Sequence, residues 1–357
     1  MENGSGEVGV RLGMGGHTRE PMVDIGIPTH GSPDYLDEAV QSVLHQTFDS
    51  WRLTVSENGA GSAEIKAILE PYLADPRVHH VTTGSEISAA KNQSGVLESG
   101  DARYVAVLHD DDRWDVDFLA RRVAFLENNP TCGLVFSNGR FIDDRGVLLA
   151  RFTVRCHEGV QRRESFFPEL YRHNFIFVPT VLGRRSAYDR IGPAFSSVFF
   201  SDYEMWLRMA AQFDVGFLET WDADYRVHSG QTTDREFQRM GEHRLELLDS
   251  VDRWLPAGLA RREGQRARAG AYLRLAFDAF NQGERKRAAA AVARALRQHP
   301  LGPLDWKMMA LVVGSLRNRA IQHKAWSHAS RRFELARIEE EHSVVLDEAS
   351  GLSPSRN

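Results

Sequence analysis

The chain has 357 residues, enough for about two domains of ordinary size. Hydrophobic residues make up 42% of it and charged residues 26%, a balance that excludes wholesale disorder and fibrous repeats. Lys and Arg number 44 against 49 Asp and Glu, so the formal net charge is −5 and no overall basicity argues for a nucleic-acid partner.

Positive charge is concentrated in one part of the chain. Residues 261–332 hold 16 Lys and Arg but only 4 Asp and Glu, which leaves the remainder strongly acidic. Three alternatives fit this basic segment: solvated helix faces, peripheral contact with an anionic membrane, or self-association against the acidic part of a second copy. Nucleic acid fits less well, because the arginines do not alternate regularly with aromatic residues.

The cysteines and the apolar segments bear on the cellular compartment. Cys132 and Cys156 are the only cysteines, which is no disulfide framework and fits a reducing compartment. No apolar run follows the N-terminus as a secretory signal requires, and the apolar residues 308–316 fall short of the ~20 that span a bilayer. We therefore expect a cytoplasmic protein, with any peripheral contact on the inner face of the membrane.

Residues 23–137 alternate between strand-like and helical patterns. Apolar runs predict strands at 23–28, 51–56, 78–82, 104–108 and 134–137. Ser32 and Pro33 predict the start of a helix, and further helical patterns cover 62–73, 87–97 and 119–126. The alternation favours an α/β domain with a mostly parallel sheet, in which ligands bind beyond the carboxyl ends of the strands. Further along, residues 271–300 predict a helical hairpin similar to one tetratricopeptide-type unit.

Three consecutive carboxylates follow the predicted strand at 104–108. Asp110, Asp111 and Asp112 repel one another, so a divalent cation explains the cluster better than a purely stabilising role does. Hard oxygen ligands of this kind suit Mg²⁺ or Mn²⁺, usually shared with substrate phosphates. The alternative is a solvated acidic turn that caps the following helix.

Seven short motifs resemble those of one enzyme family. They are residues 23–29 (VDIGIPT), 44–47 (LHQT), 55–59 (VSENG), 90–92 (AKN), 108–112 (LHDDD), 201–208 (SDYEMWLR) and 225–228 (YRVH). In this order they resemble the motifs of the inverting, nucleotide-sugar-dependent glycosyltransferases of family 2. The order makes the resemblance specific, because chance matches would not preserve it.

The resemblance implies the fold and the division of the chain. It implies a GT-A fold, a Rossmann-like α/β domain with a mixed, mostly parallel sheet flanked by helices. We expect this domain at residues 22–235, after a flexible tail at 1–21. An all-helical C-terminal region is expected at 236–345 and a disordered tail at 346–357.

The resemblance also implies an activity. A sugar would pass from a nucleotide-diphosphate donor to an acceptor hydroxyl, with inversion, a divalent metal (Mg²⁺ or Mn²⁺) and an Asp general base. UDP is the nucleotide most frequent in the family, with dTDP and GDP as alternatives, and the acceptor could be a glycan, a lipid-linked molecule or a small molecule. Two other functions stay open: a catalytically silent nucleotide- or sugar-binding scaffold, and a nucleotidyltransferase.

Individual residues take their roles from the matching motifs. Asp202 is the expected general base, with Glu204 as the alternative, and Trp206 is expected on the acceptor side. The metal is expected on Asp111 and His228, with Asp112 or His109 as a further ligand. The donor is expected to contact Pro28, Thr29, Glu57, Lys91, Asp110 and Arg184.

Two departures from the family pattern bear on these roles. His109 stands where the metal motif of the family has its first Asp, and an imidazole suits Mn²⁺ better than the harder Mg²⁺. Glu57 stands in place of an Asp, and its additional methylene shifts the contact expected with the nucleotide.

Overall fold

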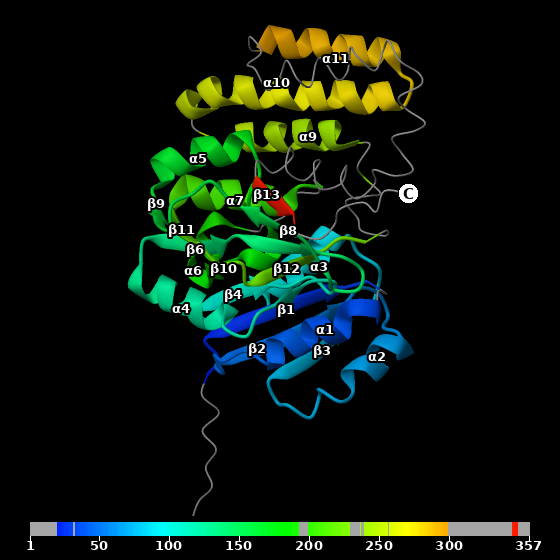
Figure 1. Ribbon diagram of the computed structural model, residues 1–357, viewed down its shortest axis with the longest axis vertical. Helices are drawn as coiled ribbons and strands as arrows, with labels where there is room; N and C mark the ends of the chain where they lie inside the picture. The colour runs from blue at the N-terminus through cyan, green and yellow to red at the C-terminus, as the bar shows by residue number, and fades with distance from the viewer. Residues whose placement is uncertain are drawn as a thin grey trace, which may run out of the picture.

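The computed structural model describes residues 20–30, 33–192, 199–228, 236, 239–255, 257–298 and 345–348. Figure 1 shows the strands and their flanking helices in the lower and middle parts of the molecule, with three C-terminal helices stacked in layers above them. The expected tail at 1–21 lies almost entirely outside the described residues. The tail expected from residue 346 begins inside a short strand, β13 (Val345–Glu348).

The larger sheet has eight strands in the order β3-β2-β1-β4-β10-β6-β11-β9. Only β9 and β10 run antiparallel to their neighbours, so the sheet is mostly parallel, as predicted. Its strands are β1 (Val23–Thr29), β2 (Trp51–Glu57), β3 (Val78–Thr82), β4 (Tyr104–Val107), β6 (Cys132–Ser137), β9 (Gly159–Gln161), β10 (Leu182–Arg184) and β11 (Asp214–Leu218).

Both faces of this sheet are buried. In β4, Val105 and Val107 belong to one apolar cluster, while Tyr104 and Ala106 belong to the other. Successive side chains of a strand point to opposite faces, so each cluster lies on its own side of the sheet. The flanking helices are α1 (Pro33–Leu44), α2 (Ala63–Leu69), α3 (Ala89–Glu98), α4 (Phe118–Asn128), α5 (Arg163–Arg172), α6 (Arg185–Ile191) and α7 (Ser201–Gln212).

One glycine allows a helix to approach the sheet closely. A Cβ atom at Gly26 of β1 would lie 2.4 Å from the Cβ of Val96 in α3. The Ser88 side chain caps the start of α3 by accepting a hydrogen bond from the Lys91 N–H. Close packing and this cap together place the first turn of α3 beside the carboxyl end of β1.

A second sheet, which the sequence did not predict, has five strands in the order β13-β8-β7-β12-β5. In this sheet β12 pairs with β7 on one side and with β5 on the other. In the pairing with β5, Ala223 lies opposite Trp114. Since β5 directly follows Asp112, this pairing brings the segment after β12 next to the acidic cluster. The new strands are β5 (Arg113–Trp114), β7 (Gly139–Ile142), β8 (Leu148–Thr153) and β12 (Ala223–Arg226).

Three helices follow the two sheets: α9 (Met240–Asp252), α10 (Ala257–Asn281) and α11 (Arg285–Gln298). The predicted hairpin is formed by α10 and α11, which turn at Gly283 with a φ of +80°. The predicted fold class is therefore confirmed: a mixed α/β fold with a mostly parallel sheet and helices at the C-terminal side. Among the described residues, no helix combines the length and the apolar character that a bilayer crossing requires.

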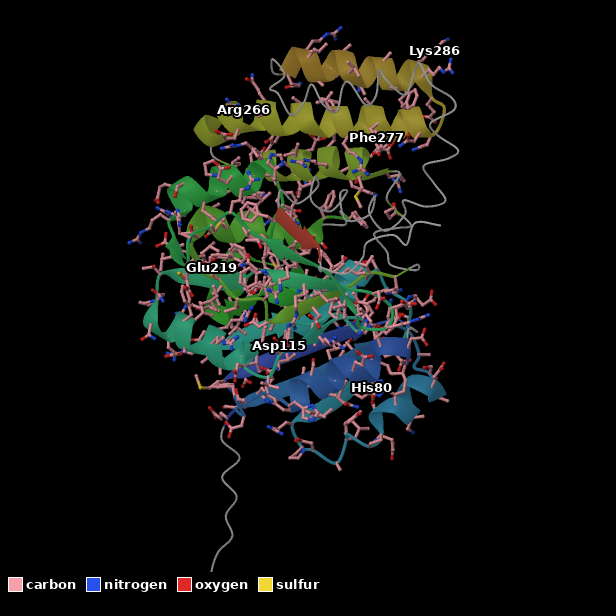
Figure 2. The ribbon with its side chains drawn as sticks, in the orientation of Figure 1. His80, Asp115, Glu219, Arg266, Phe277 and Lys286 are labelled. Atoms are coloured by element: carbon pink, nitrogen blue, oxygen red, sulfur yellow. The ribbon has the colours of Figure 1, made fainter. Side chains whose placement is uncertain are left out.

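Part of the basic segment is engaged in ion pairs. Arg268 of α10 lies 2.8 Å from Asp249 and 2.6 Å from Asp252, both on α9. Lys286, in the first turn of α11, projects away from the sheets (Figure 2). These ion pairs fit helix faces that dock on a neighbouring helix, while contact with a membrane or with a second copy stays a prediction.

Candidate active site

The carboxyl ends of β1, β2 and β4 lie at one edge of the larger sheet. Thr29 pairs with Glu57 in the register of β1 and β2. Asp110 follows β4, and the side chain of the buried Thr29 lies near enough to favour the ionised form of its carboxyl. The strand ends therefore bring together Thr29, Glu57 and Asp110, three of the residues predicted to contact the donor.

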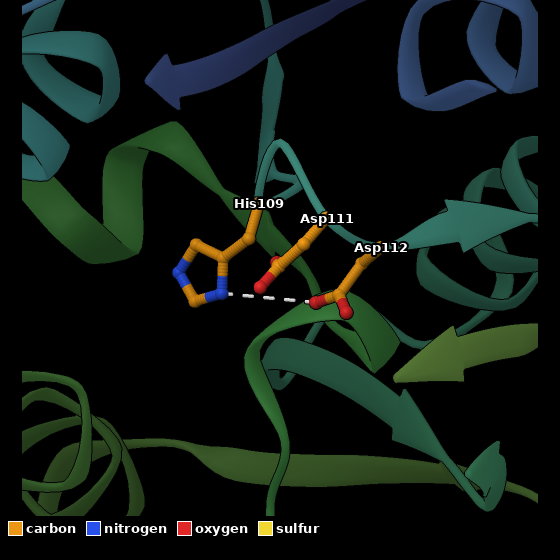
Figure 3. Close-up of side chains that lie close together, drawn as sticks. All are labelled: His109, Asp111 and Asp112. Carbon is orange, nitrogen blue, oxygen red and sulfur yellow. Dashed lines mark ion pairs between the residues drawn. The ribbon is translucent and has the colours of Figure 1, made fainter. Parts of the chain in front are cut away.

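The acidic cluster contains a group of side chains that could hold a metal ion. One ligand atom from each of His109, Asp111 and Asp112 lies within 4.8 Å of the others (Figure 3). Asp112 is buried, and its Oδ1 atom accepts a hydrogen bond from the Arg226 N–H at 2.9 Å. Its Oδ2 atom lies 3.7 Å from Nδ1 of His109 and accepts no hydrogen bond from any residue that the structure describes.

The carboxyl pKa values reflect burial and mutual repulsion. Burial and the neighbouring Asp111 charge raise the pKa of Asp110 to about 7. Burial, followed by the Asp111 charge, also raises the pKa of Asp112 well above its ordinary value. Burial acts on Asp111 in the same direction, but the hydrogen bond with His228 and the charge of His109 outweigh it, and its pKa is lowered.

His228 completes this cluster from the other sheet. It lies just beyond β12, and its Nε2 atom is 3.1 Å from Oδ2 of Asp111. The hydrogen bond with Asp111 raises the pKa of His228. The structure therefore places His228 beside Asp111, while its role as a metal ligand stays a prediction.

Tyr35, in the first turn of α1, is a neighbour of this cluster that sequence reasoning missed. Its ring centroid lies 5.1 Å from that of His228, and the Arg226 guanidinium lies 4.3 Å from the Tyr35 ring centroid. Arg226 is fully buried and donates to Glu38 at 2.7 Å and to the Asp111 carbonyl at 2.8 Å. The only available signal was the position of Tyr35 soon after the end of β1.

Asp202 lies in the first turn of α7 and is electrostatically coupled to the same cluster. Its Oδ1 atom accepts a hydrogen bond from the Tyr203 N–H at 2.7 Å. Burial raises the pKa of Asp202, while the charge of His109 lowers it. The charge of His109 also lowers the pKa of Asp111, so both carboxyl groups are influenced by the same imidazole.

The side chain of Glu204, the alternative base, is engaged in hydrogen bonds inside the protein. It is fully buried, and its Oε1 atom accepts hydrogen bonds from Arg208 at 2.5 Å and from Ser250 of α9 at 2.9 Å. Of the two carboxylates, Asp202 is therefore the one whose surroundings fit proton transfer.

Glu57 also has protein partners at the end of β2. One of its carboxylate oxygens accepts the Ser62 N–H at 2.6 Å, and the other lies 3.0 Å from Nε2 of His80 on β3. His80, labelled in Figure 2, belongs to none of the sequence motifs. Of the other predicted donor contacts, Pro28 is half-buried in β1 and Lys91 is exposed on α3.

Two predicted site residues lie elsewhere. Arg184 pairs with Tyr104 at the beginning of β4, the opposite end from Asp110, and its guanidinium donates to the Cys132 carbonyl at 2.9 Å. It lies there because β10 runs antiparallel to β4. Trp206 is 2% exposed and packs in the apolar core with Val107 and Met205, so it does not line an open acceptor site.

Comparisons with known proteins show similarity to one family of enzymes. Residues 24–192 match the model of Glycosyl transferase family 2. An uncharacterized glycosyltransferase of Methanocaldococcus jannaschii is 24% identical over 220 residues, 60% of this chain and 73% of that protein. A putative teichuronic acid biosynthesis glycosyltransferase of Bacillus subtilis is 28% identical over 134 residues, 37% of this chain and 52% of that protein.

Solved structures share the fold at low sequence identity. A mannosyltransferase from Pyrobaculum calidifontis, in complex with GDP-Man and Mn²⁺, superposes with a TM-score of 0.54 at 16% identity, covering 90% of this chain and 87% of its own. Residues 1–349 of S. aureus TarS, in complex with UDP-GlcNAc, give a TM-score of 0.52 at 14% identity, covering 92% of this chain and 97% of that one. The match over residues 24–192 and the ordered motifs support glycosyltransferase family 2, and the solved structures show that the chain has the GT-A fold.

Proposed function

We propose that the chain transfers a sugar from a nucleoside-diphosphate donor to an acceptor hydroxyl, with inversion, a divalent metal and Asp202 as general base. The observation that carries this proposal is the group of His109, Asp111 and Asp112 at the carboxyl edge of the sheet, which could hold a metal ion and whose His109 charge also acts on Asp202. An anion-stabilising centre and a proton acceptor on either side of one cleavable bond are what such a displacement requires.

The donor is proposed to bind over the ends of β1, β2 and β4. Pro28, Thr29, Glu57 and Asp110 lie along that edge and offer carbonyl, hydroxyl and carboxylate groups to a nucleoside. Lys91 is proposed to attract the diphosphate by its charge. UDP is the proposed nucleotide, while the structural neighbours bind GDP-Man in one case and UDP-GlcNAc in the other.

The metal is proposed to bind Asp111 and His228, with Asp112 or His109 as a further ligand. These side chains fit a divalent cation, because Asp112 offers a buried oxygen that accepts no hydrogen bond from the described residues. The crowded carboxylates favour such a cation, since its charge would offset the repulsion that raises two of their pKa values. Mn²⁺ suits the imidazole ligands and Mg²⁺ the carboxylates. A bound cation supplies positive charge that stabilises the departing nucleoside diphosphate.

The acid–base part of the reaction is proposed for Asp202. Its carboxylate accepts the proton of the acceptor hydroxyl as the hydroxyl oxygen forms a bond to the anomeric carbon. The bond from that carbon to the diphosphate oxygen breaks on the opposite side, so a single displacement inverts the configuration. Burial makes Asp202 a stronger base than an exposed Asp, because its charged form is less well solvated.

The decisive experiment compares wild type with Asp202→Asn, using Glu164→Gln in the first turn of α5 as a matched control. Donors carrying UDP, GDP and dTDP are supplied with Mn²⁺ and an acceptor panel. Released nucleoside diphosphate is measured, together with the anomeric configuration of the product. We expect Asp202→Asn to bind donor normally and to lose transfer by about 10²–10⁴-fold, while Glu164→Gln stays active.

Other outcomes would assign another function. Undiminished transfer by Asp202→Asn would refute the base role. Retained configuration in the product would refute the single displacement. The substitution of the family Asp by His109 favours a silent binding scaffold as the second candidate. Nucleotide binding without turnover of any donor would establish that scaffold instead.

A further inference from the structure

Helix α9 contacts the segment around Asp202 at two points. The His243 ring stacks on Phe199, with centroids 4.7 Å apart and planes 24° apart. The Ser250 hydroxyl donates to Oε1 of Glu204 at 2.9 Å. Phe199 lies three residues before Asp202 and Glu204 two residues after it, so α9 holds the chain on both sides of the proposed base.

The two contacts come from one face of α9. His243 and Ser250 are seven residues apart, which is close to two full turns of an α-helix. Leu247 and Val251 of the same helix are buried in the apolar cluster that also contains Tyr203 and Met205 of α7. The position of α9 against α7 is therefore fixed by packing as well as by its polar contacts.

Glu204 is the buried end of a polar chain. Arg253 donates to the Ser250 hydroxyl at 2.9 Å, Ser250 donates to Glu204, and Arg208 donates to the same carboxylate at 2.5 Å. Glu204 is 0% exposed, so loss of a donor would leave charge in a place that water does not reach. The first turn of α7 has little freedom to move while this chain is intact.

The other contact is supported in the same way. His243 is 6% exposed, and its Nε2 atom lies 2.9 Å from Oε2 of Glu236. A further contact of the same turn joins α7 to α5, where the Tyr203 hydroxyl donates to the Leu170 carbonyl at 2.5 Å. The segment that carries Asp202 is thus held by contacts with both α5 and α9.

We propose that α9 positions the catalytic carboxylate, with Ser250 acting through Glu204 and His243 acting through Phe199. This inference rests on the proposed role of Asp202 as the base. Proton removal requires the carboxylate oxygen to lie about 3 Å from the acceptor hydroxyl, so a displacement of under about 1 Å in the first turn of α7 lowers the rate. Neither Ser250 nor His243 contacts the residues proposed for the metal or the donor, so donor binding is not affected.

The test measures kcat and the KM for the donor in Ser250→Ala, with Asp249→Asn as the matched control. Asp249 is the preceding residue of α9, but its side chain is 66% exposed and pairs with Arg268 of α10. We expect Ser250→Ala to lower kcat about tenfold with less than about a twofold change in KM, and Asp249→Asn to change neither. The melting temperature of each variant is measured as well, to check that the substitution leaves the protein folded.

A second arm tests the other contact. His243→Phe keeps an aromatic ring against Phe199 and should retain transfer, whereas His243→Ala should lower kcat as Ser250→Ala does. Equal activities of these two variants would overturn the role of the stack. This arm also keeps the proposal testable should Ser250→Ala not fold.

A double-mutant cycle separates positioning from a general loss of stability. In the Asp202→Asn background, Ser250→Ala should cause no further loss of residual turnover, because there is no base left to position. Multiplicative losses would overturn the inference while leaving the base role intact. Full activity of Asp202→Asn alone would instead overturn the proposed role of Asp202 as the base, so the two failures are distinguishable.

Discussion

The Nε2 atom of His228 lies 3.1 Å from Oδ2 of Asp111, although the two residues are 117 positions apart in the chain. The pairing of β12 with β5 produces this contact, because β5 begins directly after the acidic cluster. The site is therefore built across the two sheets, with carboxylates from the larger one and an imidazole from the smaller one.

We expect His228→Ala to weaken Mn²⁺ binding by about 10–100-fold, the range usual for loss of one group around a metal site. The substitution removes a proposed ligand and the hydrogen bond that lowers the pKa of Asp111. The measurement is the Mn²⁺ concentration needed for nucleotide to raise the melting temperature. His45→Ala, at an exposed position just after α1, is the control. An unchanged Mn²⁺ requirement in His228→Ala would remove His228 from the metal site.

The pH dependence of transfer should report on Asp202. Burial raises the pKa of this carboxyl, and the base must be ionised to act, so kcat should fall on acidification at a higher pH than an ordinary Asp would give. The measurement is a kcat–pH profile at saturating donor and Mn²⁺. An acid limb no higher than that of an exposed Asp would contradict the assignment.

The contribution of the Asp202 carboxyl to the free energy of unfolding should change with pH in the direction opposite to kcat. A raised pKa means that the folded state holds the proton more tightly than the unfolded state does. The contribution of Asp202 to stability is thus fully present below the unfolded pKa and is lost as the pH rises through the folded one. Asp202→Asn should remove this dependence, which urea unfolding at several pH values would detect.

Arg184→Ala should destabilise the fold and leave catalysis unchanged. The guanidinium donates to the carbonyls of Leu126, Asn129 and Cys132, all at the edge of the sheet opposite the acidic cluster. We expect a loss of about 1–3 kcal/mol in the free energy of unfolding, measured by urea denaturation. The exposed Arg163→Ala is the control, with an expected change within about 0.5 kcal/mol. A raised KM for the donor in Arg184→Ala would instead return this residue to the phosphate site.

The larger sheet could be predicted from local patterns and the smaller one could not. Apolar runs such as the one at β1 mark a strand that is buried on both faces. By contrast, β5 has two residues and β7 and β12 have four each. These strands are too short to show the repeating pattern of apolar residues by which a strand is predicted. Their pairing joins residues as distant as Trp114 and Ala223, and such contacts follow from the tertiary fold rather than from neighbouring residues.

The same limit explains the successes and errors at the candidate site. Asp110, Asp111 and Asp112 stand out because charge follows an apolar strand, and His228 is marked by its motif. Arg184 was misplaced because no local pattern shows that β10 runs antiparallel to β4. His80 and Tyr35 were missed because their partners, Glu57 and His228, lie on other elements.

The contact between Ser250 and Glu204 has a practical consequence for dividing this protein. A truncation at residue 235 would follow the domain boundary expected from the resemblance, yet it would remove α9 and so expose the buried Glu204 side chain. It would also expose the apolar surface on which Leu247 and Val251 rest. A shortened enzyme, or a chimera with a relative, should therefore be divided after Asp252, so that α9 stays together with the residues of the proposed active site.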